Sequence, residues 1–315
     1  MRMSATHPLP VIRSGATPYK KLPFGTLAKI VSSAMRACYG GHMTSPAPPR
    51  ILSIAGSDSS GGAGIQADIK TITMLGGYAM TAMTAITAQN TIGVQGIVPL
   101  APEMVAQQIA SCIDDIGVDA IKIGMLHDAA VIAAVAEALA GIEAPIVLDP
   151  VMIATSGSAL IAPDAVEAMR TLLFPRAALI TPNLPELAHL VGRPLTTHDA
   201  MVDAAEELAE AVGAAVLAKG GHGETDRIRD VLYFPAAGDA GARIVSFDHA
   251  RIDTRHTHGT GCTLSSAIAT LLGHGQPLEH AVRLARQFVI RAIEAAPGFG
   301  AGHGPLGHQA VRSLA

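Results

Sequence analysis

Short apolar runs rich in β-branched residues alternate with longer Ala-rich stretches from about residue 50 onward. The short runs predict strands, and the longer stretches, in which apolar residues recur at helical spacing, predict helices. The predicted strands of this alternation span residues 51–55, 78–87, 120–124, 145–148, 177–180 and 214–218. The predicted helices span residues 63–75, 102–116, 129–140, 163–173, 261–272 and 277–295. Strands alternating with helices are typical of βαβ units, so the pattern predicts an α/β fold with a mostly parallel sheet between two helical layers.

After Lys219 the pattern changes. Two apolar runs, residues 231–234 and 243–247, predict antiparallel strands added to the sheet. No linker or internal repeat interrupts residues 50–307, so we expect one domain over residues 50–315.

The composition fits a large aliphatic core. Hydrophobic residues make up 49% of the chain and aromatic residues only 3%, with no Trp. The three cysteines (Cys38, Cys112 and Cys262) form no CxxC pair, which excludes a disulfide scaffold or Cys-rich zinc module and indicates a reducing compartment. No apolar run is long enough to span a membrane. We therefore expect a cytoplasmic protein that is not inserted in a membrane.

The charges are distributed unevenly along the chain. Residues 1–50 contain seven Lys or Arg and no Asp or Glu, so the remaining 15 basic and 26 acidic residues give residues 51–315 a formal charge of about −11. A body this acidic has no electrostatic footprint for nucleic acid. Residues 1–49 also lack hydrophobic periodicity and are broken by prolines, which predicts a basic leader without chemistry. It is a disordered tail, a targeting segment or the product of a start codon upstream of Met43.

A glycine-rich segment follows the first predicted strand. Residues 55–64 read AGSDSSGGAG, and a predicted helix containing Asp68 comes next. Closely spaced glycines let the backbone approach a ligand, and a helix start offers free N–H groups. The segment is neither GxGxxG nor a Walker A motif, and a plain turn remains the alternative.

Three further groups follow predicted strands, where ligands of open α/β sheets bind. Asp149 follows residues 146–148 and Lys219 follows residues 214–218. Asn183 and Glu186 form an N-x-x-E pair, which is either a helix capping box or part of a Mg²⁺ site. The cation of Lys219 suits a phosphate group, although an ordinary salt bridge is the alternative.

The sequence HTHGTGC, residues 256–262, leads directly into a predicted helix. Gly259, Thr260 and Gly261 at a helix start aim several N–H groups at one point, which predicts an anion hole. Cys262 would lie in the first turn, where the helix dipole is expected to lower the pKa of its thiol. The alternatives are a cysteine that only packs, and a metal site made of His256, His258 and Cys262.

Eight ordered motifs over residues 50–308 resemble one family, the hydroxymethylpyrimidine/phosphomethylpyrimidine kinases of thiamine biosynthesis, within the ribokinase-like superfamily. The motifs are AGSDSSGGAGIQADIKT (55–71), TAITAQNT (84–91), KIGML (122–126), LDPVM (148–152), TPNLPE (181–186), KGGH (219–222), HGTGC (258–262) and GHGP (302–305). The sequence departs from the family at Ser59, where the family often has Pro, and in its basic leader. In the wider superfamily an Asp acting as general base stands at the position of Cys262.

The resemblance implies a three-layer α/β/α sandwich of the ribokinase-like class. It also implies that ATP phosphorylates 4-amino-5-hydroxymethyl-2-methylpyrimidine to its monophosphate and then to its diphosphate. A pyridoxal or pyridoxine kinase of the same branch is the alternative, because both substrates carry a hydroxymethyl group on an aromatic heterocycle. The expected partners are small molecules and a second copy of the chain in a homodimer.

The family motifs also imply site residues. The residues expected to line the pyrimidine pocket are Gly56, Asp68, Gln89, Met125 and Val151, and the amide of Gln89 can both donate to and accept from an aminopyrimidine. Asn183 and Lys219 are expected to bind ATP, and Asp149 and Glu186 to bind Mg²⁺. The residues expected to be catalytic are Gly259, Thr260, Gly261 and Cys262.

Overall fold

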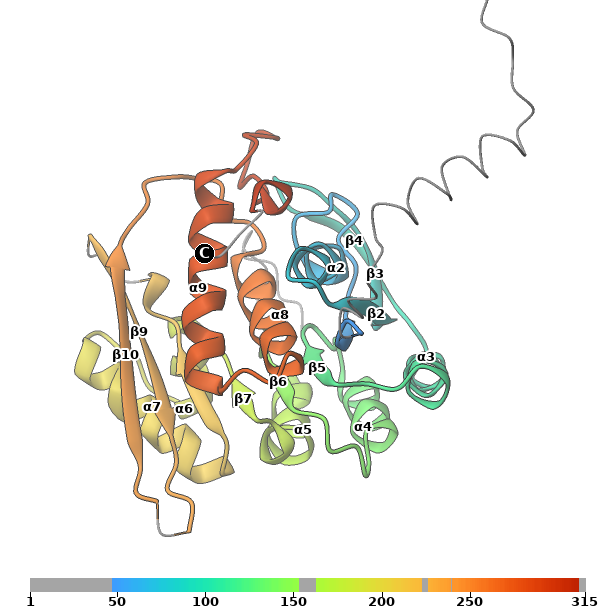
Figure 1. Cartoon of the computed structure of the whole chain (residues 1–315), viewed down its shortest axis with the longest axis horizontal. Coiled ribbons are helices and arrows are strands. Elements are labelled where there is room, and N and C mark those ends of the chain that lie inside the picture. The colour runs from blue at the N-terminus through green and yellow to red at the C-terminus, as the bar shows by residue number, and fades with distance from the viewer. Residues whose placement is uncertain (1–46, 153–162, 223–225, 239, 312–315) are drawn as a thin grey trace, which may run out of the picture. The chain divides into compact units, whose positions relative to one another are not determined.

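The computed structural model describes residues 47–152, 163–222, 226–238 and 240–311. The described residues from Pro48 onward belong to one compact unit, which is drawn in Figure 1. The predicted leader lies, up to residue 46, outside the described residues.

An eight-stranded sheet runs through this unit in the order β10-β9-β8-β7-β6-β5-β1-β2. Its strands are β1 (Arg50–Ala55), β2 (Tyr78–Met83), β5 (Ala120–Ile123), β6 (Ile146–Leu148), β7 (Leu179–Ile180), β8 (Ala215–Ala218), β9 (Arg227–Phe234) and β10 (Arg243–Ala250). In this sheet β2, β1, β5, β6, β7 and β8 are parallel to one another. Strand β9 is antiparallel to β8, and β10 is antiparallel to β9. The predicted parallel sheet and its two antiparallel additions are confirmed.

Helices cover both faces of the sheet, as Figure 1 shows. One layer contains α2 (Gly64–Met74), α8 (Thr260–Gly273) and α9 (Leu278–Glu294). The other contains α3 (Pro102–Asp115), α4 (Ala129–Ala138), α5 (Pro163–Leu172), α6 (Leu184–Val191) and α7 (His198–Val212). In β1, Leu52 and Ile54 belong to the core under α3–α7, whereas Ile51 belongs to the core under α8 and α9. Successive strand residues point to opposite faces, so an unbroken apolar strand serves both cores.

Residues 78–87 were predicted as one strand, and this prediction is wrong. The chain leaves the large sheet at Thr84, and β3 (Ala85–Gln89) pairs instead with β4 (Val94–Pro99), a strand that the pattern did not predict. The hydroxyl of the fully buried Thr84 donates to the carbonyl of Met125 at 2.7 Å. This tertiary bond anchors the bend, and nothing in the local apolar pattern announces it.

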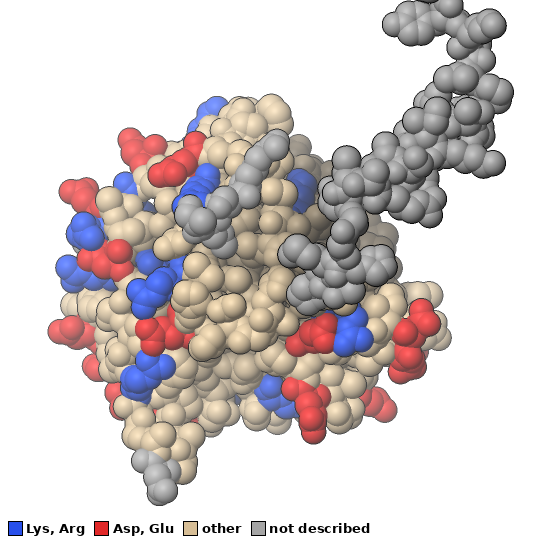
Figure 2. Space-filling view, in the orientation of Figure 1, with Lys and Arg blue, Asp and Glu red and all other residues tan. Residues whose placement is uncertain are grey.

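No helix in the described part of the chain is both long and apolar enough to cross a membrane. On the face shown in Figure 2, basic and acidic side chains are interspersed along β9 and β10, and no broad area carries a single sign.

Two opposite charges lie fully buried at the centre of the unit. The Nζ atom of Lys122 on β5 is 2.8 Å from Oδ2 of Asp68 on α2, and both side chains are 0% exposed. The hydroxyls of Ser53 on β1 and Ser266 on α8 also donate to this carboxylate, at 2.6 and 2.5 Å. The cluster therefore joins two strands of the sheet to two helices of one layer.

Lys122→Met should destabilise the protein by about 3–5 kcal/mol, because it leaves the Asp68 carboxylate buried without its counter-charge. The double variant Lys122→Met/Asp68→Asn removes both charges and keeps an acceptor for the serine hydroxyls, so it should recover a large part of the loss. Urea unfolding followed by circular dichroism measures the free energy of unfolding of the single and the double variant. A single variant as stable as the wild type would show that the pair contributes nothing.

Candidate functional site

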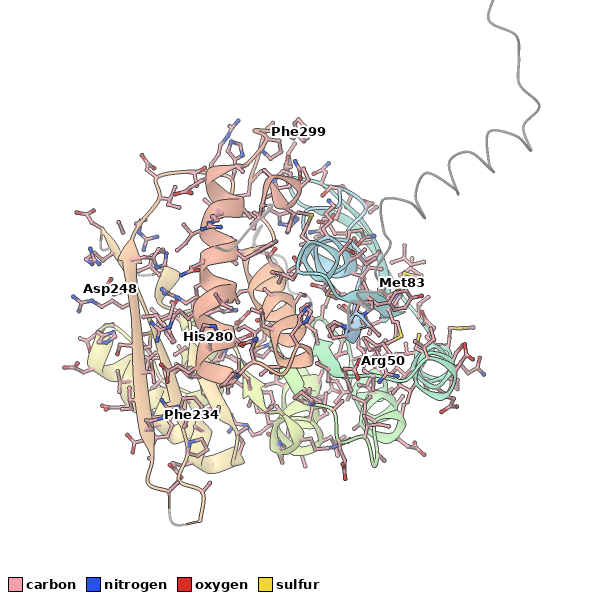
Figure 3. All side chains as sticks on the ribbon, in the orientation of Figure 1. Arg50, Met83, Phe234, Asp248, His280 and Phe299 are labelled. Atoms are coloured by element: carbon pink, nitrogen blue, oxygen red, sulfur yellow. The ribbon has the colours of Figure 1, made fainter. Side chains whose placement is uncertain are left out.

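The side chains that carry chemistry gather at one edge of the sheet, where the parallel strands end. Asp149 follows β6, Lys219 follows β8 and Gly56 follows β1. In Figure 3, the labelled residues Phe234 and Asp248 lie toward opposite ends of the β9–β10 pair, and Phe299 lies beyond the Asp248 end. Ligands of open α/β sheets bind outside the carboxyl ends of the strands, so this edge is the candidate site.

An ion pair lies at the centre of this edge. The Nζ atom of Lys219 is 2.8 Å from Oδ1 of Asp149, which also accepts a hydrogen bond from the hydroxyl of Thr181 at 2.9 Å. Burial alone would raise the pKa of Asp149, but Lys219 and Lys122 together hold that pKa below its usual value. Asp149 is therefore a carboxylate, and both of these bonds involve Oδ1, so its Oδ2 atom accepts no hydrogen bond among the described residues.

Asn183 and Glu186 form the predicted capping box at the start of α6. The N–H of Asn183 donates to Oε2 of Glu186 at 2.8 Å, and the N–H of Glu186 donates to Oδ1 of Asn183 at 2.9 Å. Burial raises the pKa of Glu186 to about 7, with Asp149 adding to the rise and Lys219 opposing it. The capping role is thus confirmed. Because the charges of Asp149 and Lys219 both act on the pKa of Glu186, the three side chains belong to one electrostatic cluster.

The start of α8 faces this cluster. Gly259 has a left-handed φ of +86°, and a Cβ there would overlap the carbonyl oxygen of Gly62, so only glycine fits. A Cβ on Gly261 would lie 3.2 Å from Oδ2 of Asp149 and 3.5 Å from Nζ of Lys219. The first N–H groups of a helix have no partner within the helix. The amides of Gly261 and Cys262, a lysine cation and two carboxyl groups therefore converge in one place, whereas the N–H of Thr260 already donates to the carbonyl of Thr257 at 3.3 Å.

Cys262 lies in the first turn of α8, as predicted, but its predicted acidity is wrong. Burial raises the pKa of the thiol to about 11, and Asp68 and Asp149 add to the rise. The ammonium of Lys122 and the N–H of Gly64 act in the opposite direction without overcoming it. Loss of solvent disfavours the thiolate, and it raises the pKa of the thiol by more than the helix dipole lowers it.

The predicted pyrimidine pocket is assembled in part. A Cβ on Gly56 would overlap the Cε atom of Met125, and Met125 packs with Ala85 and Val151 in a small apolar cluster. The partly exposed Gln89 ends β3. This strand is held along the segment after Gly56 by hydrogen bonds that it exchanges with Ser57 and Ser59: both serines donate to its carbonyls, and its N–H groups donate to both serine hydroxyls.

The structure does not place Asp68 among these residues. Its side chain is fully buried, and its two oxygens already accept from Ser53, Lys122 and Ser266. The resemblance to the kinase family implied that Asp68 lines the pocket. However, it lies one turn into α2 and faces the core.

Two residues of this edge were given no part in the kinase site that the sequence predicted. Asp58 and His258 are both buried, and Oδ2 of Asp58 is 2.8 Å from Nε2 of His258. Both belong to motifs noted above, but 200 positions separate them and no local pattern connects them. The alternative of a metal site at His256, His258 and Cys262 finds no support, because the described residues contain no cluster of three or more His, Cys, Asp or Glu side chains able to hold a metal ion.

The comparisons with known proteins agree with the motifs. A family model described as phosphomethylpyrimidine kinase matches residues 58–307. The hydroxymethylpyrimidine/phosphomethylpyrimidine kinase of Streptomyces coelicolor is 46% identical over 84% of this chain and 98% of its own length. The thiamine biosynthesis bifunctional protein ThiED of Geobacter sulfurreducens is 44% identical over 82% of this chain, which spans about half (52%) of that longer protein.

Solved structures show the same fold. The phosphomethylpyrimidine kinase of Clostridium difficile 630 has a TM-score of 0.66 at 38% identity and is matched over 78% of this chain and 99% of that one. The pyridoxal kinase of Bacillus subtilis, solved as an ADP complex, has a TM-score of 0.75 at 37% identity, over 84% and 99%. The ribokinase-like α/β/α architecture is thereby confirmed. The chain belongs to the hydroxymethylpyrimidine/phosphomethylpyrimidine kinase family, whose members are phosphotransferases of thiamine biosynthesis.

Proposed function

We propose that this protein transfers the γ-phosphoryl group of ATP to the hydroxymethyl group of 4-amino-5-hydroxymethyl-2-methylpyrimidine, and then a second phosphoryl group to the monophosphate. The observation that carries the proposal is the position of Gly261. It brings the free amides of α8 against both Asp149 and Lys219 at the ligand-binding edge of the sheet. Phosphoryl transfer depends mainly on positioning and on stabilising negative charge, and this cluster supplies both.

The phosphate end of the proposed site consists of Lys219, Asn183 and the α8 start, which comprises Gly259, Thr260, Gly261 and Cys262. The N–H of Thr260 donates to the carbonyl of Thr257, and the N–H groups of Gly261 and Cys262 have no partner within the helix. The lysine cation and the α8 amides attract the same anion, because a helix start combines unpaired N–H groups with the positive end of the helix dipole. When an anion binds, Lys219 can donate to it while keeping its contact with Asp149, since an ammonium group has three protons.

The pyrimidine end consists of Gln89, Gly56, Met125 and Val151. The absence of a side chain at Gly56 leaves room for the Met125 methyl group, which with Val151 offers an apolar wall to a flat ring. Gln89 provides an amide whose donor and acceptor match the two kinds of polar group on an aminopyrimidine.

Asp149 and Glu186 fit a divalent cation. Asp149 is ionised, and among the described residues its Oδ2 atom accepts no hydrogen bond, while the carboxyl group of Glu186 already accepts from the backbone N–H groups of Asn183 and Met152. Hard cations such as Mg²⁺ prefer carboxylate oxygens of this kind. When bound, Mg²⁺ would neutralise charge on the phosphates of ATP, while the residues named above hold and orient the two substrates.

Cys262 is the proposed acceptor of the hydroxyl proton. Because burial raises its pKa to about 11, the thiolate is a minor species at neutral pH. The loose transition state of phosphoryl transfer demands little from a base, so a small thiolate fraction can suffice.

We also propose that the protein is a cytoplasmic homodimer. Cys112 and Cys262 are unpaired thiols, which fits a reducing compartment. Large apolar side chains are exposed on β2, β3, β4 and α3 and would be covered in a dimer. They are Tyr78, Ile86, Val98 and Met104.

The proposed function is tested by ATP consumption with three substrates side by side: hydroxymethylpyrimidine, its monophosphate and pyridoxal. Pyridoxal belongs in the assay because several similar structures are pyridoxal kinases. We expect turnover of both pyrimidines, with kcat/KM for pyridoxal lower by at least about tenfold, or 1.4 kcal/mol. Preferred turnover of pyridoxal would instead support the alternative.

Cys262→Ala keeps the amides of α8 but removes the proposed base. We expect kcat to fall by about 10²–10⁴-fold while an ATP analogue still binds. Because the thiol titrates at about 11, the wild-type rate should rise with pH through the neutral and mildly alkaline range, and the Ala variant should lose that rise. Cys262→Asp should restore part of the rate. Single-turnover measurements that place Cys262→Ala within about threefold of the wild type would show that the residue only packs.

Glu186 must ionise before it can hold Mg²⁺, and its pKa is about 7. The Mg²⁺ concentration for half-maximal turnover should therefore rise about tenfold for each pH unit below neutrality and level off above it. Glu186→Gln should need more Mg²⁺ at every pH and lose this dependence. Glu207→Gln, at an exposed carboxylate on α7, is the matched control. A pH-independent Mg²⁺ requirement in the wild type would contradict the assignment.

A further inference from the structure

The Asp58–His258 pair lies between the two glycine-rich segments of the site. Asp58 belongs to the glycine loop (residues 56–64), and His258 immediately precedes the α8 start (Gly259–Cys262). The Asp58 side chain is 1% exposed and His258 is 6% exposed. A hydrogen-bonded pair of this kind is protected from competing water, so it can hold two segments together more firmly than an exposed pair.

Asp58 also gives the glycine loop its shape. Its Oδ1 accepts from the N–H and the hydroxyl of Ser60, and its Oδ2 accepts from the N–H groups of Gly62 and Ala63 at 3.1 and 2.8 Å. His258 adds its bond to that same Oδ2 atom. The loop is thus folded around one carboxylate, and His258 is its link to α8.

The two segments are in direct contact at this link. A Cβ on Gly62 would overlap the His258 ring, and a Cβ on Gly259 would overlap the carbonyl of Gly62. A displacement of the His258 imidazole would therefore move the α8 start, which begins at the next residue.

Gln89 meets the same imidazole from the side of the proposed pyrimidine pocket. Its Nε2 atom is 3.5 Å from Nε2 of His258. The His258 bond to Asp58 and the bonds from Ser60 and Ala63 hold the pKa of Asp58 at about 2 against the effect of burial, so the carboxylate only accepts. Nε2 of His258 must then carry the proton. Nε2 of Gln89 and Nε2 of His258 are then both hydrogen-bond donors, so neither can accept from the other. The amide N–H of Gln89 is therefore left for another acceptor.

The closing GHGP motif strengthens this junction. The N–H of His258 donates to the carbonyl of Gly304 at 3.2 Å, and the N–H of His303 donates to the carbonyl of Thr91, two residues beyond Gln89, at 2.9 Å. One short segment thus fixes both His258 and the residues that directly follow Gln89 at the end of β3.

We propose that the Asp58–His258 pair is a positioning unit for phosphoryl transfer, which sets the α8 start at a fixed place relative to Gln89 and keeps the Gln89 amide N–H available to a ring nitrogen of the substrate. This role rests on the proposed function of the site and adds to it two residues that do not react themselves. Misplacement of a reacting group by about 1 Å can cost about 10²-fold in rate, so the pair matters without touching the phosphoryl group.

The test compares three variants. His258→Leu removes the donor to Asp58, whereas His258→Gln keeps a side-chain N–H of similar reach. Ser60→Ala is the matched control, because it removes a different hydrogen bond to the same carboxylate and leaves His258 untouched. Circular dichroism and melting temperature establish that each variant is folded.

We expect His258→Leu to lower kcat/KM for the pyrimidine by about 10²-fold while KM for ATP changes less than about threefold. His258→Gln should recover at least about tenfold of that loss, and Ser60→Ala should stay within about threefold of the wild type. Equal losses in His258→Leu and His258→Gln, or a His258→Leu variant as active as the wild type, would overturn the proposal.

A second readout needs no substrate. The rate at which iodoacetamide alkylates Cys262, followed by mass spectrometry of its peptide, reports the position of the α8 start. His258→Leu should change this rate by more than about threefold and His258→Gln should restore it. If the wild type turned over neither pyrimidine, the proposed function would fail, and the alkylation rates would still decide whether His258 positions α8. Unchanged rates in His258→Leu would refute that role.

Discussion

The fully buried ion pair between Lys122 and Asp68 is the interaction on which the rest of the structure depends. Two unpaired charges in this position would be very costly, so the core is stable only if β5 and α2 bring them together. Through Ser53 and Ser266 the same carboxylate also connects β1 and α8. Ser266 lies one helical turn after Cys262, so the pair fixes the height at which α8 begins above the sheet.

Close backbone approach is the second constraint. The left-handed Gly259 lets the carbonyl of Gly62 come into contact with the start of α8, and Gly261 lets Asp149 and Lys219 lie beside the first turn. A side chain at Gly259 would push the glycine loop away from the start of α8, and one at Gly261 would crowd Asp149 and Lys219. The glycines thus convert an ordinary sheet edge into a place where cations, carboxylates and free amides meet.

The parallel sheet and the positions of Asp149, Lys219 and the α8 start could be predicted from the sequence, because alternating strands and helices place strand ends together. The capping box at Asn183 and Glu186 was also readable, since its spacing is local. Contacts distant in sequence were not readable. Thr84 diverts β3 through a bond to Met125, Asp68 faces Lys122 in the core, and Asp58 meets His258 across most of the chain. The acidity of Cys262 was mispredicted because burial, which no local pattern reveals, outweighs the helix dipole.

In the proposed function, ATP and the pyrimidine meet at the edge built by Gln89, Lys219 and the α8 start. The most direct measurement is a crystal structure of the protein with hydroxymethylpyrimidine, a non-hydrolysable ATP analogue and Mg²⁺. We expect the ring to contact the Gln89 amide and the γ-phosphate to accept hydrogen bonds from the amides of α8 and from Lys219. A pyrimidine bound away from Gln89, or a γ-phosphate out of reach of Gly261 and Cys262, would contradict the proposed function.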